Sequence, residues 1–209
     1  GGWPLNPRSH EIEDPGFDMP CPGAIGCECK SSTDCSNNNC QAYPGGNFCI
    51  PKIGDVIPRF EAIDQFGETV DLYDFAHQGK MVLVELSAAW CSPCNDLAAW
   101  LATNDLTIKE NPWWKDRYLP IRDMIKNQEI YLVNAMFVGN VKKVPATPKD
   151  AANWYKYYPE PNVPVLADEY NFLFNWVKPT GYPCIILLDE NMQVLVYANR
   201  GLHDAFLYL

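Results

Sequence analysis

Two cysteines separated by two residues carry the clearest chemistry in this sequence. Cys91 and Cys94 enclose Ser92 and Pro93, and they follow an apolar run that ends at Trp90. Apolar residues at helical spacing come next, so we expect the pair at the start of a helix. A sulfur atom there faces the positive end of the helix dipole and unpaired N–H groups, which stabilise a thiolate and lower its pKa.

This arrangement predicts thiol–disulfide exchange. We expect the thiolate of Cys91 to attack a substrate disulfide and form a mixed disulfide. Cys94 lies one helical turn further on, and we expect it to attack Cys91 in turn and release the reduced product. Because Ser92 and Pro93 add no cation beside the thiolate, the pair should be fairly reducing, with a potential nearer to about −270 mV than to about −120 mV.

Two structural uses of such a pair compete with this interpretation. The pair could supply half of a zinc site, but no second pair has this spacing and His10, His77 and His203 are scattered along the chain. A purely structural disulfide would close so short a loop that it removes little entropy from the unfolded chain. A strand before the pair and a helix after it favour redox chemistry, so no metal is predicted.

The elements that position the pair are expected to alternate between strands and helices. Residues 81–86 form a continuous apolar run with one acid, which is typical of a central strand covered on both faces. Further strands are predicted at 60–72 (a hairpin that turns at 65–67), 129–138, 163–166, 184–188 and 193–197. Helices are predicted at 91–103, after a capping box at 147–150, and at 202–209. The last two strands form a hairpin, so the predicted fold is α/β with a mixed central sheet and flanking helices.

Residues 104–128 look like an insertion between these elements. Asn111 can cap a helix whose first residue is Pro112. Pro120 should kink or split that helix, because proline in a helix interior removes a hydrogen bond and clashes with the preceding turn.

A second group of cysteines lies near the N-terminus. Residues 21–50 contain few aliphatic side chains and many Asn, Ser, Gly and Pro residues, so they cannot close a hydrophobic core and need covalent bridges. Zinc is the alternative, but the segment has no histidine and more cysteines than one tetrahedral site uses. We expect structural disulfides, whose pairing the sequence leaves open, among Cys21, Cys27, Cys29, Cys35, Cys40 and Cys49.

Length and charge indicate the organisation of the chain and exclude some partners. The 209 residues suffice for an irregular leader arm (1–20), a cysteine-rich module (21–50) and one main domain (51–209). A formal net charge of −10 disfavours nucleic acid and anionic membrane surfaces as partners. No apolar run is long enough to cross a bilayer. Disulfides and a start without methionine predict an extracytoplasmic protein (periplasmic, at the cell surface or secreted) whose leader, with any anchor, has been removed.

Several of these segments together resemble the thioredoxin-like superfamily, in the branch called TlpA/ResA-type or AhpC/TSA-redoxin. The resemblance extends over residues 53–201 and rests on the residues at 53–55, 60, 64–67, 70–72, 80–84, 90–94, 181–183 and 185–189. It implies a thioredoxin fold and a thiol–disulfide oxidoreductase that needs no cofactor. It also implies protein disulfides or dithiols as substrates and an upstream redox protein as a partner.

The resemblance assigns roles to three residues outside the pair. Pro183 would be a cis-proline that faces the cysteines and lets the backbone before it pair with substrate, and an ordinary trans proline is the alternative. Glu85 would be a buried acid of raised pKa that relays the proton of Cys94, or only a satisfied core acid. Trp90 would shield the pair and offer an apolar docking surface, or simply pack in the core.

Three features depart from the family pattern. The insertion is longer than in the simplest members and contains Trp113 and Trp114, for which core packing is a commoner role than partner recognition. Cys184 directly follows the expected cis-proline and is either a third thiol near the pair or a small buried residue, of which we favour the second. The cysteine-rich module has no counterpart in the pattern, and it would bind a partner or form a stalk.

Two other functions compete with disulfide reduction. A thiol peroxidase shares this fold, but it needs Thr or Ser three residues before its reactive cysteine, where this sequence has Ala88, and a proline further upstream, which residues 81–90 lack. In a non-enzymatic protein the module would bind a surface partner and the main domain would be an inert scaffold. The intact cysteine pair argues against that interpretation.

Overall fold

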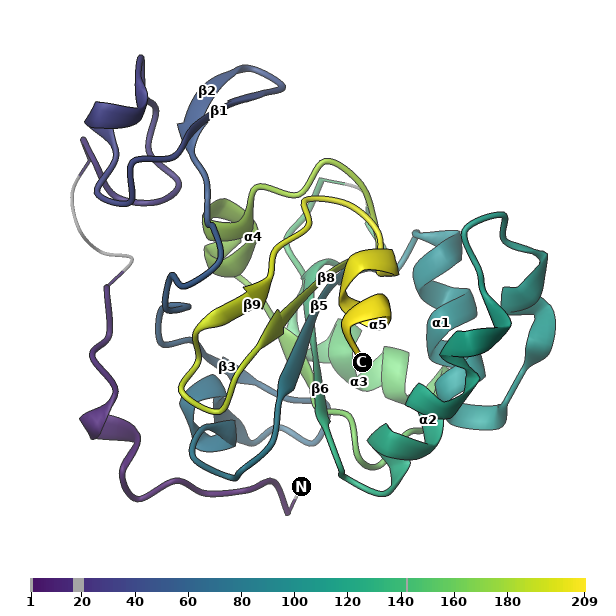
Figure 1. Cartoon of the computed structure of the whole chain (residues 1–209). Helices are drawn as coiled ribbons and strands as arrows, with labels where there is room; N and C mark the ends of the chain where they lie inside the picture. Colours follow the sequence, from purple (N-terminus) through teal and green to yellow (C-terminus); the bar gives the residue numbers. More distant parts are fainter. Residues whose placement is uncertain (1, 17–20, 142) are drawn as a thin grey trace.

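A five-stranded sheet organises the chain, of which the computed structural model describes residues 2–16, 21–141 and 143–209. The strand order is β7-β6-β5-β8-β9 (Figure 1). The strands are β5 (Val82–Ala88), β6 (Tyr131–Val138), β7 (Val165–Ala167), β8 (Cys184–Leu188) and β9 (Val194–Val196). β6 pairs in parallel with β5 and β7, whereas β8 is antiparallel to β5 and β9, so the sheet is mixed, as predicted.

Strand β5 lies at the centre of this sheet. All of its residues are buried, and so are all residues of its neighbour β6. A strand covered on both faces needs apolar residues without alternation, which is why residues 81–86 read as a continuous apolar run. The predictions of a central strand here and of a strand within 129–138 are confirmed.

Helices cover both faces of the sheet (Figure 1). The helices that pack mainly with Leu83 and Leu132 are α1 (Ser92–Thr103), α2 (Leu119–Lys126) and α5 (His203–Tyr208). The helices that pack with Val84 and Val133 are η3 (Leu72–Phe75), α3 (Pro148–Tyr157) and α4 (Phe172–Val177). Across the described residues, no helix has the length and apolar character needed to span a bilayer.

A β-hairpin precedes the strands of the sheet in the sequence, as predicted. Its strands β3 (Glu61–Ile63) and β4 (Thr69–Asp71) are antiparallel. Gly67 in the turn has a φ of 81°, a conformation that favours glycine. The carboxylate of Asp64 accepts two backbone N–H groups of the turn and the indole N–H of Trp3, so it ties both the turn and the N-terminal arm.

The insertion is built differently from the prediction. Asn111 is the N-cap of no helix; it is instead the C-cap residue of η4 (Leu106–Glu110), and its Nδ2 donates to the carboxylate of Asp96 at 3.0 Å and to the carbonyl of Ile108 at 3.1 Å. Pro120 neither kinks nor splits a helix, because α2 begins at Leu119 and proline is tolerated in a first turn, where N–H groups have no intrahelical partner. Two short 3-10 helices, η4 (Leu106–Glu110) and η5 (Asp116–Tyr118), precede α2.

The tryptophan pair of the insertion contributes to the core. Trp114 is buried, and its ring lies edge-on to Trp100 and to Tyr118, with centroids 5.0 and 5.6 Å apart. Trp113 is partly buried and packs against the same cluster. Packing, rather than recognition of a partner, therefore accounts for Trp114.

Helix α4 was not predicted from the sequence. Its residues Phe172–Val177 are apolar at almost every position, so they show no helical periodicity. The flanking residues Asn171 and Lys178 both adopt positive φ, which ends the helix at each side. Tertiary packing of Leu173, Trp176 and Val177 decides this helix.

The cysteine-rich module, residues 21–50, contains the expected disulfides. It holds the 3-10 helix η2 (Ser32–Asp34) and a hairpin of β1 (Cys40–Tyr43) and β2 (Gly46–Cys49). The bonded pairs are Cys21–Cys27, Cys29–Cys40 and Cys35–Cys49. The sulfur atoms of Cys29, Cys35 and Cys49 lie within 4.8 Å of one another, but each is in a disulfide, and zinc binds the thiolate form.

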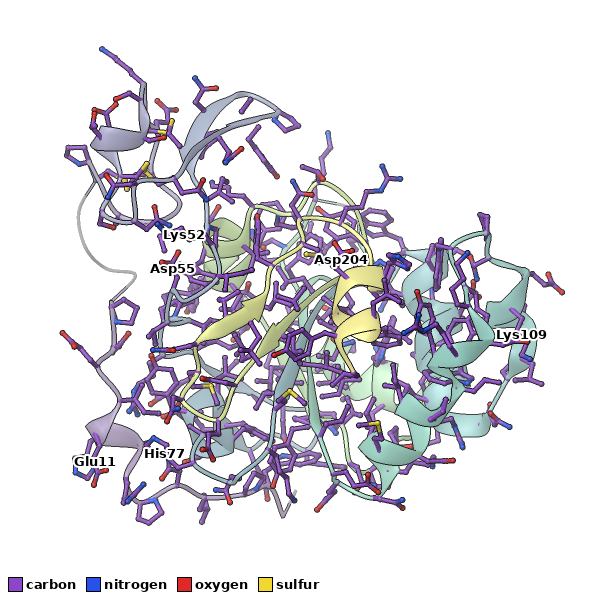
Figure 2. All side chains as sticks on the ribbon, viewed as in Figure 1. Glu11, Lys52, Asp55, His77, Lys109 and Asp204 are labelled. Atoms are coloured by element: carbon purple, nitrogen blue, oxygen red, sulfur yellow. A yellow bond between two sulfur atoms is a disulfide. The ribbon has the colours of Figure 1, made fainter. Side chains whose placement is uncertain are left out.

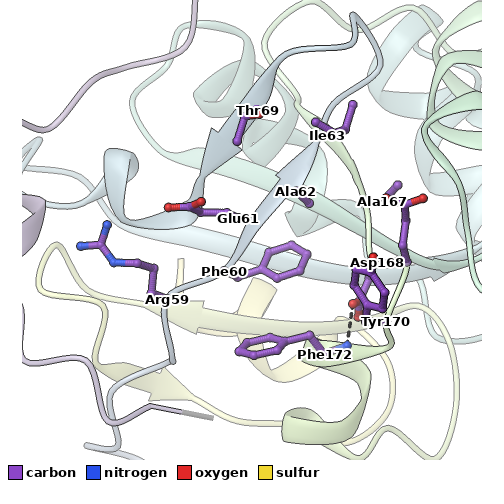
Figure 3. A pocket seen from close by; sticks show the side chains of 11 residues that line it. Arg59, Phe60, Glu61, Ala62, Ile63, Thr69, Ala167, Asp168, Tyr170 and Phe172 are labelled. Atoms are coloured by element: carbon purple, nitrogen blue, oxygen red, sulfur yellow. Dashed lines mark hydrogen bonds between the residues drawn. The ribbon is translucent and has the colours of Figure 1, made fainter. Parts of the chain in front are cut away.

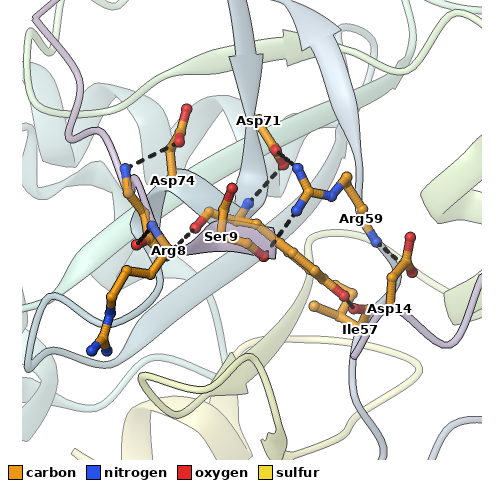
Figure 4. Close-up of polar contacts among 9 residues, drawn as sticks. Arg8, Ser9, Asp14, Ile57, Arg59, Asp71 and Asp74 are labelled. Atoms are coloured by element: carbon orange, nitrogen blue, oxygen red, sulfur yellow. Dashed lines mark hydrogen bonds and ion pairs between the residues drawn. The ribbon is translucent and has the colours of Figure 1, made fainter. Parts of the chain in front are cut away.

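The N-terminal arm lies along the main domain in residues 2–16, whereas residues 17–20 of the predicted leader lie outside the described residues. It contains the 3-10 helix η1 (Ser9–Glu11). Figure 4 shows Arg59 between Asp71, with which it forms an ion pair, and the carbonyl oxygen of Ser9, to which it donates at 2.9 Å. Nearby, the backbone N–H of Asn6 donates to Asp74 at 3.2 Å. These contacts attach an otherwise irregular segment.

The capping box at the N-terminus of α3 allows a test of how much a side-chain cap stabilises the fold. The backbone N–H and hydroxyl of Thr147 both donate to the carboxylate of Asp150. Thr147→Ala should lower the free energy of unfolding by about 1 kcal/mol in urea denaturation of the oxidised protein. Lys149→Ala, an exposed change on the same helix, should alter it by less than about 0.5 kcal/mol. Equal stability of the two variants would contradict the role of the cap.

Candidate active site

The cysteine pair lies at the N-terminus of α1, as predicted. Cys91 is the N-cap residue, and its Sγ accepts the backbone N–H of Cys94 at 3.2 Å. Cys91 and Cys94 form a disulfide with their Cα atoms 5.3 Å apart. Cys91 is 3% exposed and Cys94 is fully buried. The same N–H group and the helix dipole would stabilise a thiolate at Cys91 in the reduced protein.

The turn between β5 and α1 is held by side chains outside the motif. Asn95 donates through Nδ2 to the carbonyl oxygens of Ala89 and Cys91, at 3.3 and 2.9 Å. Its Oδ1 accepts the hydroxyl of Tyr158 at 3.1 Å. The sequence did not predict a role for Asn95 or Tyr158 in this turn. A polar residue directly after the pair was visible there, but nothing indicated its partner from the end of α3.

Glu85 belongs to a buried polar chain on the face of β5 that α1 covers. Its Oε2 accepts Nδ2 of Asn134 at 2.9 Å, and Oδ1 of Asn134 accepts the hydroxyl of Ser87 at 2.7 Å. All three side chains are buried. The parallel pairing of β5 and β6 places Glu85 opposite Asn134 and so brings the chain together. Polar residues inside two apolar strands were the signal for Asn134 and Ser87, which the sequence analysis did not select.

Burial controls the charge of Glu85. Loss of solvation raises the pKa of its carboxyl from 4.5 to about 8, and the hydrogen bond from Asn134 opposes this shift. Among the described residues, Oε1 of Glu85 has no hydrogen-bond partner. A small cavity of about 20 Å³ lies beside this side chain, with Ala98 and Leu101 of α1 and Tyr158 on its walls. That volume can hold about one water molecule.

Pro183 directly precedes β8, at the edge of the sheet where the chain leads from β5 to the cysteine pair. The antiparallel register opposes Leu86 to Cys184, so Pro183 lies next to the carboxyl end of β5, from which the chain continues to α1. The Tyr182–Pro183 peptide bond is cis, as expected. The carbonyl oxygen of Pro183 accepts the N–H of Gly201 at 2.7 Å.

Trp90 lies at the surface of the site, with 44% of its side chain exposed. Its ring lies edge-on to Tyr182 at a centroid distance of 5.8 Å, and Tyr182 packs in turn on Phe137 at 4.7 Å. The aromatic residue before the pair thus touches the residue before Pro183. The roles of Trp90 in shielding the cysteine pair and in docking a substrate stay predictions.

Cys184 is a free thiol with no exposed surface. Its Sγ donates to the carbonyl oxygen of Ala198 at 3.1 Å. Burial, and secondarily the negative charge of Glu85, raise the pKa of this thiol well above its ordinary value. Because the thiolate is the nucleophile, this environment favours a small buried residue over a third reactive thiol.

A more open pocket lies at another place, between β3 and the end of β7. It has a volume of about 330 Å³, and its described lining contains no cysteine or histidine. Figure 3 shows the rings of Phe60, Tyr170 and Phe172 around it, and the hydrogen bond from the N–H of Phe172 to Asp168. Burial raises the pKa of Asp168 to about 6, against the hydrogen bonds it accepts from α4. The cysteine pair therefore lies outside this pocket.

The arrangement of strands, helices and cysteine pair is that of the thioredoxin fold, as predicted. The chain is similar to the thioredoxin domain of a thiol-disulfide oxidoreductase from Bacteroides vulgatus, with 22% identity over 76% of this chain and 97% of that chain and a TM-score of 0.51. It is also similar to a hypothetical protein from Sinorhizobium meliloti, with 16% identity over 71% and 70% of the two chains and a TM-score of 0.54. A conserved protein of unknown function from Bacteroides fragilis has 14% identity, over 76% and 98%, with a TM-score of 0.52.

These likenesses establish the fold. No protein-family model matches the chain, and the search of curated proteins found no match.

The raised pKa of Glu85 gives a prediction for stability. Between about pH 4.5 and pH 8 the unfolded chain releases this proton while the folded protein keeps it, so stability falls as the pH rises through this window and levels off above it. The contribution has an upper limit of about 1.4 kcal/mol for each pH unit. Glu85→Gln keeps an oxygen for Asn134 and should flatten this dependence in urea unfolding of the oxidised protein.

Glu169→Gln, which removes an exposed carboxylate, serves as the control and should keep the wild-type slope. A Glu85→Gln protein with the wild-type pH dependence would show that Glu85 is ionised in the fold already at acidic pH.

Proposed function

We propose that this protein is an extracytoplasmic thiol–disulfide oxidoreductase that reduces protein disulfides through Cys91 and Cys94. The observation that carries the proposal is the position of Cys91 as the N-cap of α1, where its sulfur accepts a backbone N–H. The surroundings suit a disulfide substrate, because partly exposed Trp90 and the backbone before Pro183 flank the pair.

The reaction has two exchange steps. The thiolate of Cys91 attacks one sulfur of the substrate disulfide, which forms a mixed disulfide and releases the other substrate sulfur as a thiolate that takes a proton. Cys94 then loses its proton and attacks Sγ of Cys91, which releases the second substrate thiolate and closes the Cys91–Cys94 disulfide. The substrate gains two electrons and the cysteine pair loses two. A dithiol reductant returns the pair to its starting state.

Glu85 is the group that we assign to the proton of Cys94. A carboxyl whose pKa is about 8 can both take and return a proton near neutral pH, which is what a relay requires. Glu85 lies on the face of the sheet that α1 covers, and the small cavity with room for one water joins its side chain to that helix. Asn134 orients the carboxylate through the hydrogen bond that its Nδ2 donates.

The compartment and the direction of electron flow form part of the proposal. Three disulfides in the module support an oxidising environment such as the periplasm or the cell surface. One structure to which the chain is similar carries the name thiol-disulfide oxidoreductase. Ser92 and Pro93 supply no cation beside Cys91, which supports a reducing pair fed by an upstream redox protein.

The first experiment separates the roles of the two cysteines. In an insulin-reduction assay with dithiothreitol, Cys91→Ser should abolish turnover because it removes the attacking thiolate. Cys94→Ser should also stop turnover but should accumulate a mixed disulfide with insulin, which mass spectrometry detects. Trapping by Cys91→Ser instead would reverse the assignment, and an inactive wild type whose pair does not titrate against dithiothreitol would refute the proposed function.

The second experiment tests the relay by its pH profile. Single-turnover release of the mixed disulfide should accelerate through a pKa near 8 in the wild-type protein. Glu85→Gln should slow this step about a hundredfold, within the range for general base catalysis, and should remove the inflection. The rate of the first attack by Cys91 should not change. A parallel loss in both steps would assign Glu85 a structural role only.

A further inference from the structure

The cysteine-rich module touches the main domain at the loop that leads to Pro183. We call residues 178–183 the Pro183 loop. The hydroxyl of Tyr43, at the tip of the module hairpin, donates to the carbonyl oxygen of Pro179 at 2.7 Å. Nζ of Lys178 lies 4.5 Å from the centroid of the Phe48 ring, in a cation–π contact. Burial lowers the pKa of this lysine, and the negative charge of Glu28 in the module opposes that shift.

The part of the module that makes these contacts is a hairpin braced by two disulfides. Tyr43 and Phe48 come from paired strands and pack edge-on, with ring centroids 5.7 Å apart. Both strands are tied to the rest of the module, since Cys40 on β1 bonds to Cys29 and Cys49 on β2 bonds to Cys35. The contacts with the Pro183 loop therefore come from a covalently braced surface.

The module is attached to the main domain a second time, at the linker between them. The carboxylate of Asp55 accepts Nδ2 of Asn37 at 2.7 Å and the N–H of Lys52 at 2.8 Å. Figure 2 shows Lys52 and Asp55 below the module. Between this attachment and the hairpin tip lies an open cavity of about 560 Å³, lined by Tyr43 from the module and by Tyr197 and Asn199 from the main domain. This cavity separates the attachment at Asp55 from the contacts of the hairpin tip, while Ile25 of the module packs against the apolar core of the main domain.

The Pro183 loop is also held by the segment that follows β9. The N–H of Thr180 donates to the carbonyl of Asn199 at 2.6 Å, and the N–H of Gly201 donates to Pro183. The side chain of Arg200 lies so close to Gly181 that a Cβ there would be 2.7 Å from its Cγ. The loop therefore depends on two sets of contacts, one with the module and one with the segment after β9, and a change in either set can move it.

The Pro183 loop carries the surface that a large substrate would meet. Tyr182 in this loop contacts Trp90, the residue before the reactive cysteine. A small disulfide needs only to reach Cys91, whereas a protein disulfide must also fit the backbone and side chains around it. Support for the loop therefore affects the two kinds of substrate differently, because binding energy from parts remote from the reacting sulfur depends on the position of the loop.

We propose that the cysteine-rich module is a support for the Pro183 loop, with Tyr43 and Lys178 as positioning residues that favour protein disulfides over small disulfides. The inference rests on the proposed function, since it assigns a substrate preference to the same site. It also accounts for a disulfide-stapled module on a domain that has its own core.

The test compares two substrates in the full-length protein. Tyr43→Phe, which removes the hydrogen bond to Pro179, should raise KM for insulin about fivefold, the factor expected for one net hydrogen bond. Lys178→Gln, which removes the contact with Phe48, should act in the same direction. For both variants kcat, the reduction potential of the cysteine pair and the rate with the small disulfide dithiobis(nitrobenzoate) should stay at wild-type values.

Two controls match the chemistry of these changes. Tyr208→Phe removes a hydroxyl on α5, and Lys30→Gln removes an exposed charge on the module; both should keep the wild-type KM for insulin. The inference would be overturned if Tyr43→Phe and Lys178→Gln kept the wild-type KM for insulin. It would also be overturned if the two variants lost equal activity with insulin and with the small disulfide.

Hydrogen exchange provides a readout that does not depend on activity. The N–H groups of Thr180 and Gly201 are hydrogen bonded within the main domain, so loosening of the contacts between the loop and the module should make them exchange faster in Tyr43→Phe. Unchanged exchange would refute the support by the module even if insulin reduction were absent. A wild-type protein that reduces neither disulfide, with faster exchange in the variant, would refute the proposed function and leave the structural support in place.

Discussion

The structure depends on the burial of one strand between two neighbours of opposite direction. β5 pairs in parallel with β6 and antiparallel with β8, and all of its residues are buried. The parallel pairing aligns Glu85 with Asn134, and the antiparallel pairing brings Pro183 to the end of the strand from which Cys91 follows. A shift by one residue would turn every side chain of β5 to the other face, so a single register sets the whole site.

The burial of β5 also sets the protonation state of Glu85. An ionised carboxylate in the core is unfavourable unless it is paired, and here its described partner is the neutral amide of Asn134. The carboxyl therefore keeps its proton to a higher pH, which lowers the stability of the fold above the ordinary pKa of the group. Because Glu85 reduces stability in this way and lies beside the helix of the cysteine pair, we propose proton transfer as its role.

The module and the main domain reach stability by different means. The main domain encloses two clusters of buried apolar side chains, one on each face of its sheet. The module has three disulfides in place of such a core. A hairpin braced by disulfides can hold a neighbouring loop through a few contacts, because the hairpin itself changes conformation little when the loop moves. Tyr43 on Pro179 and Phe48 on Lys178 are contacts of this kind.

The sequence by itself determined the elements whose signals are local. The strand with continuous apolar residues, the helix after Cys91, the capping box at Thr147 and the disulfide-stapled module followed from spacing and composition, and the resemblance added the fold and Pro183. The tertiary structure decided the features that join distant segments. Asn111 ends a 3-10 helix and bonds to Asp96 instead of starting a helix, and α4 formed from an apolar segment without periodicity. It also decided the pairing of the cysteines, the Asn134 partner of Glu85 and the contact of Tyr43 with a loop 136 residues away, because such contacts exist only once the chain is packed.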